Sequence, residues 1–174
     1  MILSQSFFQS KNTIKIAKKL LGKFLVRKYR GQTRAYMITE VEVYDGFRDK
    51  ASHAYRGMTA RNKAMFGPAG HWYVYFTYGM HWMLNIVTGP SNYPAAILIR
   101  SIKIAHPERS RRTTNLNGPA RITKALKINK KLNGKPATKH SGLWIENRGA
   151  RIKPNQIKSA FRVGVDYAGP IWSK

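Results

Sequence analysis

Residues 36–44, with the sequence YMITEVEVY, are the stretch that most clearly indicates the fold class. Aromatic and β-branched residues fill it, which is typical of a β-strand, and successive strand side chains point to opposite faces. One set is mostly apolar and is predicted to face the core: Met37, Thr39, Val41 and Val43. The other set is predicted to line a pocket: Tyr36, Ile38, Glu40, Glu42 and Tyr44.

Other strand patterns lie on both sides of this stretch. A turn around Gly31 joins it to a preceding strand. Strands are predicted over residues 24–29, 71–78, 82–87, 95–102, 143–145 and 161–165. Residues 104–115 are polar and basic, and we predict a loop there.

Helical patterns are fewer. A helix is predicted over residues 13–21, ended by Gly22, with an apolar stripe of Ile14, Ala17, Leu20 and Leu21. Thr59 is predicted to cap a short helix that runs through Met65. Gly118-Pro119 is predicted to open another, with a buried side of Ile122, Ala125 and Leu126. Many strands without regular strand–helix alternation predict one mixed α+β domain, residues 1–174, on a mainly antiparallel sheet with peripheral helices.

The composition indicates a folded protein that binds nucleic acid. Hydrophobic residues make up 43% and aromatic residues 11% of the 174 positions, enough for a core. The 32 Lys and Arg residues face 7 Asp and Glu residues, a net charge of +25. So many positive charges repel one another, and they favour binding to the phosphate backbone of a nucleic acid. Charge alone does not distinguish DNA from RNA, from an acidic lipid surface or from general solubility.

Cysteine usage and hydropathy indicate the compartment. The absence of cysteine excludes disulfides and Cys-based zinc sites, and it fits a reducing compartment. Residues 1–11 lack the pattern of a signal peptide, and no apolar run approaches the roughly 20 residues that span a bilayer. We therefore expect a cytoplasmic protein with no membrane partner.

Four of the seven acidic residues fall within ten positions: Glu40, Glu42, Asp45 and Asp49. A phosphate-binding surface is expected to avoid carboxylates, because they repel the ligand. The cluster therefore suggests a chemical task. Local pairing with Arg34, Arg48 and Lys50 on a solvated edge is an equally good explanation.

Glu42 and Tyr44 are neighbours on the predicted pocket face, and His53 follows in a loop. A carboxylate beside an aromatic ring and a histidine suits a site that holds a flat base and activates a water. For each residue taken singly, a surface carboxylate or a hydrogen-bonded loop histidine is the more ordinary interpretation.

Residues 66–82 hold seven of the chain's twenty aromatic residues. Strand parity places Tyr73 and Tyr75 on one face, opposite Trp72 and Phe76. One face is expected to be core, while tyrosines on the other suit stacking against bases. Tyr78, at a strand tip, could wedge into a base stack. An ordinary turn tyrosine is the alternative.

Asn85 and Arg100 are polar residues in apolar strands. An unpaired buried polar group costs roughly 1–3 kcal/mol, so each is a structural hydrogen-bonding group or part of a site. Arg100 could pair with Glu42. A metal site has less support, because the histidines lack zinc-helix spacing. A Mg²⁺ site formed by Glu40, Glu42 and Asp49 is a minor alternative.

Five runs of sequence are specific enough to compare with known families: AKKLLGK (17–23), TEVEVY (39–44), TARN (59–62), YVYFTYGM (73–80) and NGPA (117–120). Together they resemble the alkyladenine (3-methyladenine) DNA glycosylase family, which is distinct from the helix-hairpin-helix glycosylases. The resemblance covers about residues 14–169. For a bacterial member it implies a curved antiparallel sheet, no metal or organic cofactor, and a monomer in the nucleoid that acts on double-stranded DNA containing damaged purines.

The resemblance implies roles for the pocket residues. Glu42 would be the general base that activates the attacking water, and Arg100 would help to fix that water. Tyr44 would stack on one face of the flipped base, opposite His53 and Tyr75. Asn85 would oppose the exocyclic amino group of normal guanine.

The resemblance also implies contacts with the duplex. Tyr78 would fill the gap left by the flipped base, and Thr59 and Met80 would contact the DNA. Val43 and His81 depart from the common family residues, Ala and Tyr, near the pocket. Bacterial members usually continue into a short aromatic, basic tail, so we expect the end at Lys174 to be a trimmed one.

The function implied is the excision of alkylated or deaminated purines by hydrolysis of the N-glycosidic bond, which leaves an abasic site. A non-catalytic basic nucleic-acid-binding module is one alternative, although it leaves the acid cluster unexplained. A Mg²⁺-dependent nuclease is another, and it should need its metal and cut strands directly. The sequence does not give the lesion range, which is 3-methyladenine alone or also hypoxanthine and etheno adducts.

Overall fold

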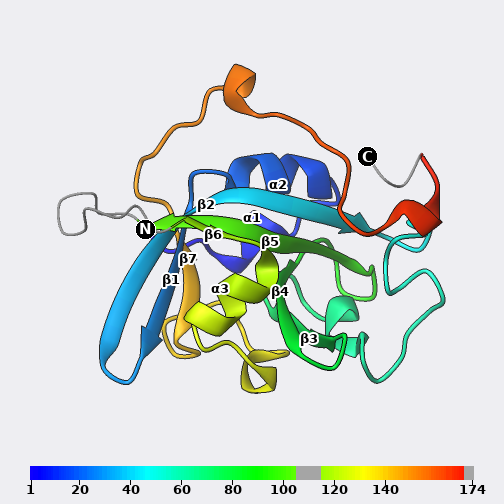
Figure 1. Ribbon diagram of the computed structural model, residues 1–174, viewed down its shortest axis with the longest axis horizontal. Coiled ribbons are helices and arrows are strands. Elements are labelled where there is room, and N and C mark those ends of the chain that lie inside the picture. The colour runs from blue at the N-terminus through cyan, green and yellow to red at the C-terminus, as the bar shows by residue number, and fades with distance from the viewer. Residues whose placement is uncertain (105–114, 171–174) are drawn as a thin grey trace.

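An antiparallel sheet organises the computed structural model, which describes residues 1–104 and 115–170. Within these residues, seven strands are ordered β3-β4-β5-β2-β1-β7, with β6 against β5. Their bounds are β1 Phe24–Tyr29, β2 Gln32–Asp45, β3 Trp72–Thr77, β4 His81–Val87, β5 Ala95–Ile104, β6 Asn115–Asn117 and β7 Leu143–Glu146. Figure 1 shows the sheet strongly curved, with β1 and β7 on one side of β2 and β5, and β3 and β4 on the other. The predicted α+β class is confirmed.

Short helices surround the sheet (Figure 1). The α-helices are α1 Gln5–Phe8, α2 Thr13–Leu20 and α3 Pro119–Ala125. The 3₁₀ turns are η1 Lys63–Phe66, η3 Lys130–Leu132, η4 Pro154–Gln156 and η5 Asp166–Ala168. Among the described residues, no helix combines the length and apolar character that crossing a membrane requires.

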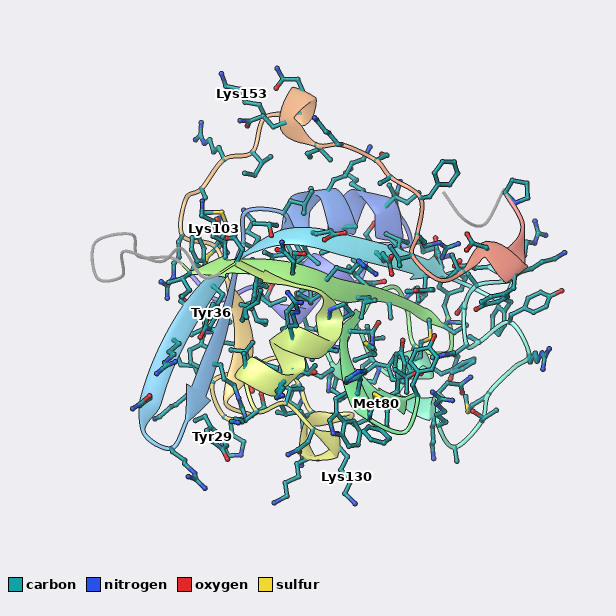
Figure 2. The ribbon with its side chains drawn as sticks, in the orientation of Figure 1. Tyr29, Tyr36, Met80, Lys103, Lys130 and Lys153 are labelled. Carbon is teal, nitrogen blue, oxygen red and sulfur yellow. The ribbon has the colours of Figure 1, made fainter. Side chains whose placement is uncertain are left out.

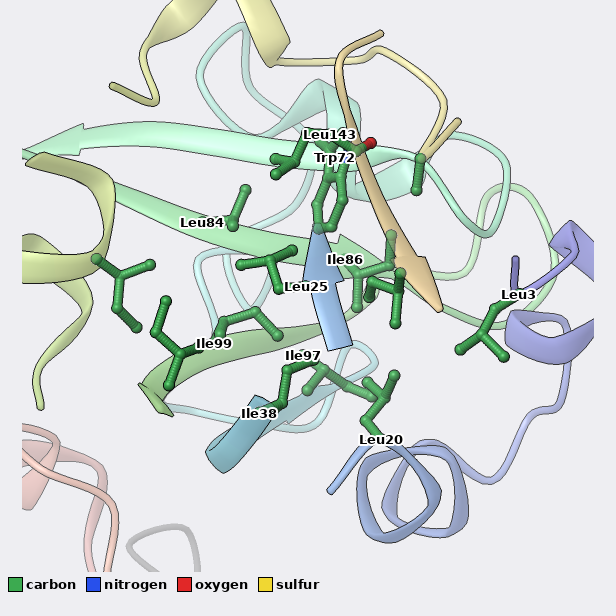
Figure 3. Close-up of a cluster of buried hydrophobic side chains, with 14 of the residues drawn as sticks. Leu3, Leu20, Leu25, Ile38, Trp72, Leu84, Ile86, Ile97, Ile99 and Leu143 are labelled. Carbon is green, nitrogen blue, oxygen red and sulfur yellow. The ribbon is translucent and has the colours of Figure 1, made fainter. Parts of the chain in front are cut away.

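The core is formed by side chains from almost every element, as Figure 3 shows for ten labelled residues. They are Leu3, Leu20, Leu25, Ile38, Trp72, Leu84, Ile86, Ile97, Ile99 and Leu143. The buried Trp72 donates its indole N–H to the backbone oxygen of Leu143 at 3.0 Å, so the polar atom of this ring is satisfied. This core fixes the sheet that positions the pocket.

The predicted alternation of β2 is wrong over its first half. Residues assigned to opposite faces share the main core: Tyr36, Ile38, Val41 and Val43. The register against β5 shifts between Ile38 and Glu40 and again between Glu40 and Val41. An extra residue in a strand reverses the side to which later residues point. Glu42 and Tyr44 therefore face the pocket as predicted, whereas Tyr36 and Ile38 do not.

The helix over residues 13–21 is confirmed as α2, but its buried face differs from the prediction. Ile14 is 56% exposed, whereas Ile16 is buried. Thr13 occupies the core face one turn before Ile16 and Ala17, and its hydroxyl donates to Asp45 Oδ1 at 3.1 Å. Because the polar Thr13 lies on the buried face, the apolar residues of the sequence alone predicted the wrong face for the core.

Other local predictions had mixed outcomes. In α3, Ile122 is buried as predicted, but Thr123 rather than Ala125 shares that side. The short helix predicted from Thr59 is reduced to the 3₁₀ turn η1. Residues 161–165 belong to no strand. Of the predicted loop 104–115, Ile104 and Asn115 lie in β5 and β6, and the residues between them lie outside the described part.

The C-terminal arm, residues 147–170, has little regular structure apart from η4 and η5. In Figure 1 it passes over α2 and returns, in orange and red, toward the end of β2 and the loop that follows. We call that loop, residues 46–62, the β2 loop. Both the arm and the β2 loop contribute residues that line the pocket described below.

Candidate active site

A pocket of about 480 Å³ gathers most of the predicted site residues. It is lined by seven of them: Glu42, Tyr44, His53, Tyr75, Tyr78, Asn85 and Arg100. Thr59 and Met80 are not among its lining residues. A larger groove of about 760 Å³ beside α2 is lined by basic, asparagine and apolar side chains without any acidic residue, so it offers no equivalent carboxylate.

The carboxylate of Glu42 is held on both oxygens. Oε1 accepts hydrogen bonds from Arg100 Nη1 and from the backbone N–H of Val163, each at 3.0 Å. Oε2 accepts the hydroxyl of Tyr44 at 3.2 Å. Glu42 is only 7% exposed, so these contacts orient a carboxylate within the pocket rather than at the surface. Such a group is suited to accepting a proton from a bound water.

Arg100 connects Glu42 to a second acidic residue. Its Nε donates to Glu40 Oε1 at 3.2 Å, and Glu40 Oε2 accepts the hydroxyl of Ser101 at 2.6 Å. The Glu40 side chain is 53% exposed, whereas that of Arg100 is 16% exposed. The exposed Glu40 therefore holds the guanidinium of Arg100 through Nε, while Nη1 of the same group donates to Glu42.

Aromatic rings form a slot beside the carboxylate. The rings of Tyr73 and Tyr75 have centroids 5.2 Å apart at 33°, and His53 meets Tyr75 edge-on at 4.5 Å and 82°. His53 Nδ1 and the Tyr73 hydroxyl share a hydrogen bond of 3.0 Å. Strand parity correctly placed Tyr73 and Tyr75 on the pocket face. Together with Tyr44, these rings line the pocket beside Glu42, and we call this set of rings the slot.

Burial shifts the pKa values of the groups in the slot in the direction that favours their uncharged forms. Burial raises the pKa of Tyr44, and the neighbouring Glu42 carboxylate raises it further. Burial also raises the pKa of Tyr75 to about 12, against an opposing effect of Arg61. Partial desolvation of the His53 ring lowers its pKa, and the nearby Arg61 charge adds to this. Neutral aromatic rings can attract a cation through their faces.

Asn85 lies on β4 directly opposite Tyr73 and is 2% exposed. Its Nδ2 donates to the backbone oxygen of Tyr73 at 3.1 Å, which fixes the amide against the slot. Both neighbours, Leu84 and Ile86, belong to the main core, so strand alternation turns Asn85 to the pocket.

Tyr78 occupies the turn between β3 and β4 in a left-handed conformation. Its φ is 51° and that of Gly79 is 65°, and Met80 N–H donates to the oxygen of Thr77 at 3.1 Å. A left-handed non-glycine residue costs about 1–2 kcal/mol, and such cost often marks a functional position. The ring is 81% exposed at the mouth of the pocket.

Thr59 and Met80, the two remaining predicted site residues, lie on exposed turns outside the pocket. Thr59 takes part in a closed turn with Asn62, whose Oδ1 accepts the Thr59 N–H at 2.6 Å and whose N–H donates to the Thr59 hydroxyl at 3.3 Å. Met80 is 65% exposed and lies directly before β4, two residues after Tyr78. Both residues are exposed to solvent.

Each carboxylate of the acidic cluster has its own contacts. Glu40 and Glu42 pair with Arg100, Asp45 accepts from Thr13, and Asp49 pairs with Arg162 of the C-terminal arm. Pairing with Arg34, Arg48 and Lys50 is therefore not what organises the cluster. No three His, Asp or Glu side chains gather as a metal site in residues 1–104 and 115–170, and Asp49, a member of the alternative Mg²⁺ set, is paired with Arg162.

The sequence interpretation missed the contribution of the C-terminal arm. Val163 donates to Glu42, Arg162 contacts Asp49, and Tyr167 lines the pocket. These contacts join residues more than 100 positions apart, and no local pattern reveals them. The one local signal is a short apolar stretch with an embedded arginine at residues 161–165, for which the sequence predicts a strand that the structure does not form.

Cationic side chains lie on several sides of the molecule. Figure 2 shows the labelled Lys103, Lys130 and Lys153 at widely separated places. The charge therefore does not mark the site by itself, and the pocket geometry is more informative.

Comparisons with known proteins agree with one another. A family model described as methylpurine-DNA glycosylase (MPG) matches residues 6–173. Relatives that carry the name "Putative 3-methyladenine DNA glycosylase" include the three described next. That of Methanocella arvoryzae is 40% identical over 171 residues, 93% of this chain and 84% of its own length. That of Carboxydothermus hydrogenoformans is 41% identical over 175 residues, which are 95% of this chain and 90% of its own length. That of Streptomyces avermitilis is 40% identical over 179 residues, which are 97% of this chain and 84% of its own length.

Proposed function

Since the chain belongs to the methylpurine-DNA glycosylase family, and is therefore a DNA repair hydrolase of the 3-methyladenine type, we propose that it excises alkylated or deaminated purines from double-stranded DNA with Glu42 as general base. The observation that carries this proposal is the carboxylate of Glu42, buried beside Tyr44 and held by three hydrogen-bond donors. The protein acts as a monomer and needs no cofactor.

The reacting sugar carbon, C1′, is inaccessible inside a stacked duplex, so the damaged nucleotide must be rotated into the pocket. Flipping costs a few kcal/mol of unpairing and unstacking, and less for a damaged base. Tyr78 enters the stack in its place, and Thr59 and Met80 contact the duplex beside it. The net charge of +25 holds the phosphates while the nucleotide is flipped.

The slot selects the flipped base. Alkylation at N3 or N7 places positive charge on a purine, and a cationic ring binds well between neutral, electron-rich aromatic rings. Tyr44 stacks on one face, with His53 and Tyr75 on the other. The same charge makes the purine a good leaving group.

In the chemical step Glu42 removes a proton from a water that Arg100 helps to orient. The water oxygen forms a bond to C1′, the bond between C1′ and the purine nitrogen breaks, and the purine leaves with the electron pair. The products are the free base, a protonated Glu42 that returns its proton to solvent, and an intact strand with an abasic site. General-base assistance of this kind contributes about 10²- to 10⁴-fold to a rate.

Incubation with alkylated DNA tests this function directly. The protein is expected to release free 3-methyladenine at the same rate with and without a metal chelator, and to leave the strand uncut until alkali cleaves the abasic site. Undamaged DNA of the same sequence is the control. Binding without base release would favour the non-catalytic module, and chelator-sensitive strand cutting would favour a nuclease.

Asn85 is expected to exclude normal guanine. The shorter side chain of Asn85→Ser removes the amide that faces the slot, so excision of undamaged guanine should rise about tenfold relative to 3-methyladenine. The measurement is the ratio of the two bases released by wild type and variant. An unchanged ratio would contradict a gatekeeping role for Asn85.

Tyr78→Asn is expected to raise stability and weaken lesion binding. An Asn-Gly pair suits two successive left-handed residues better than Tyr-Gly, which should add about 0.5–1 kcal/mol to the free energy of unfolding. Loss of the ring that replaces the flipped base should weaken affinity for lesion DNA about tenfold.

Tyr29→Asn, at the hairpin between β1 and β2, is the matched control for this variant because Tyr29 is 42% exposed and does not line the active-site pocket. It should leave affinity for lesion DNA unchanged. Denaturant unfolding and a DNA-binding titration measure the two effects separately. If Tyr78→Asn bound lesion DNA as tightly as wild type, Tyr78 would not be a DNA contact.

A further inference from the structure

A buried ion pair joins the C-terminal arm to the β2 loop. Arg162 Nη1 and Nη2 donate to the two carboxylate oxygens of Asp49 at 2.8 and 3.1 Å. Arg162 is 8% exposed and Asp49 is 3% exposed. Asp49 also accepts the backbone N–H groups of Ala51 at 3.0 Å and Asp45 at 3.2 Å, so the carboxylate shapes the start of the β2 loop as well.

The same guanidinium reaches the end of β2 beside the proposed base. Arg162 Nη1 donates to the backbone oxygen of Val43 at 2.8 Å, and its Cζ lies 5.1 Å from the centroid of the Tyr44 ring. Val43 follows Glu42 directly, and Tyr44 is a wall of the slot. A single side chain therefore contacts the backbone next to the proposed base and the ring that stacks on the substrate.

The residue after Arg162 completes the arrangement. Val163 N–H donates to Glu42 Oε1 at 3.0 Å. Consecutive Cα atoms are about 3.8 Å apart and joined by a planar peptide, so the position of Arg162 determines where the Val163 N–H lies. Releasing Arg162 from Asp49 would allow the arm, and this donor, to move away from Glu42.

Stability alone is a weak reason for such a pair. The desolvation of two buried charges offsets most of their attraction, and apolar replacements of similar size are often equally stable. Arg162 instead contacts the backbone one residue from Glu42 along β2, and it lies one residue from the Val163 donor along the arm. These positions connect the pair to the geometry of the site.

We propose that Arg162 and Asp49 are positioning residues: their ion pair docks the C-terminal arm so that the Val163 N–H holds the Glu42 carboxylate, and the guanidinium holds Tyr44, in the reactive geometry. This inference rests on the proposed role of Glu42. Neither residue touches the substrate, and both act through groups that do. A misplacement of about 1 Å at a reacting group can cost on the order of 10²-fold in rate.

The test separates positioning from folding with the double variant Arg162→Met/Asp49→Leu, which leaves no uncompensated buried charge. Its thermal midpoint should return toward that of wild type relative to Arg162→Met alone. Its single-turnover rate of base release at saturating lesion DNA should remain about 10²-fold below wild type, with a much smaller change in the Kd for that DNA. A double variant with a wild-type rate would overturn the proposal.

A conservative variant provides a second readout if the double variant does not fold. Arg162→Lys keeps the charge, but an ammonium cannot bind both Asp49 oxygens and the Val43 oxygen as a planar fork does. We expect an intact fold and a rate about tenfold below wild type, and a wild-type rate in this variant would also overturn the proposal.

Arg148→Met is the matched control for the arginine substitutions. Arg148 also lies in the C-terminal arm and also forms an ion pair, at 2.8 Å with Glu146, but neither residue lines the pocket. The rate of base release by Arg148→Met should equal that of wild type. A lower rate seen only in the Arg162 variants would then be due to the lost contact between Arg162 and Asp49.

Failure of this inference is distinguishable from failure of the proposed function. A wild-type protein that releases no base would refute the function. A wild-type protein that releases base, with Arg162→Lys and the double variant equally fast, would leave the function intact and refute only the positioning role.

Discussion

Glu42→Gln should lower base release by about 10²- to 10⁴-fold while binding of lesion DNA is retained. The amide fits the existing contacts. Its oxygen can accept from Arg100 and Val163, which both donate to Oε1, and its nitrogen can donate to the Tyr44 hydroxyl, which now donates to Oε2. The substitution therefore removes the basicity of the side chain with little change of geometry, and the thermal midpoint should stay near that of wild type.

Single-turnover base release and a binding titration on the same lesion duplex measure the two outcomes for Glu42→Gln. Glu40→Gln is the matched control, because Glu40 lies on the same strand and also contacts Arg100, but its side chain is 53% exposed. It should change the rate by less than about threefold, as expected for an exposed ion pair. Undiminished release by Glu42→Gln would refute the proposed mechanism.

Arg100→Met should lower both activity and stability. Arg100 is the cation paired with Glu42 at 3.0 Å, and the two side chains are 16% and 7% exposed. Removing one partner of a largely buried pair leaves the other charge uncompensated, which costs up to about 3 kcal/mol of unfolding free energy. The water that Arg100 helps to orient would also lose a contact, so we expect base release to fall about 10²-fold.

The rate of base release by Arg100→Met is to be compared below its thermal midpoint, where the variant is folded. Arg100→Lys keeps the charge but lacks the planar guanidinium that contacts Glu40 and Glu42 together. Its rate of base release should lie between those of wild type and Arg100→Met. Circular dichroism monitors the fold while base release is assayed. An Arg100→Met variant that is folded and fully active would exclude Arg100 from the reaction.

Local sequence patterns identified much of the fold correctly. The strand predicted over residues 24–29 is β1 with the same bounds, and the turn at Gly31 is present with a φ of 77°. The strands at 82–87 and 143–145 lie within β4 and β7. These elements were predictable because alternation and turn residues act within a few positions of one another.

Errors arose where long-range contacts override a local pattern. The bulge in β2 is defined by the register of β2 against β5, which lies more than 50 residues later in the chain. No residue in YMITEVEVY predicts it. In α2 a buried Thr13 replaced an apolar residue on the core face because Asp45 supplies a partner for its hydroxyl. Residues 161–165 have a strand-like composition, but the side chain of Arg162 holds them in place instead of a ladder.

The site was predictable as a set of residue types but not as a network. Glu42 and Tyr44 are neighbours on one strand face, so their proximity follows from spacing alone. Arg100 was expected as a partner of Glu42, and the 3.0 Å contact agrees with that expectation. The part played by Arg162, Asp49 and Val163 was not expected, because 113 residues separate Arg162 from Asp49.

By itself, the sequence determined the charge of the protein, most of its strands, the aromatic pocket face of β3 and the family motifs. All of these depend on composition or on residues a few positions apart. The tertiary structure decided where the register of β2 shifts, which cation pairs with Asp49 and where the C-terminal arm docks. These depend on strand register and on closing loops of tens to more than a hundred residues, and only the complete packed chain determines such contacts.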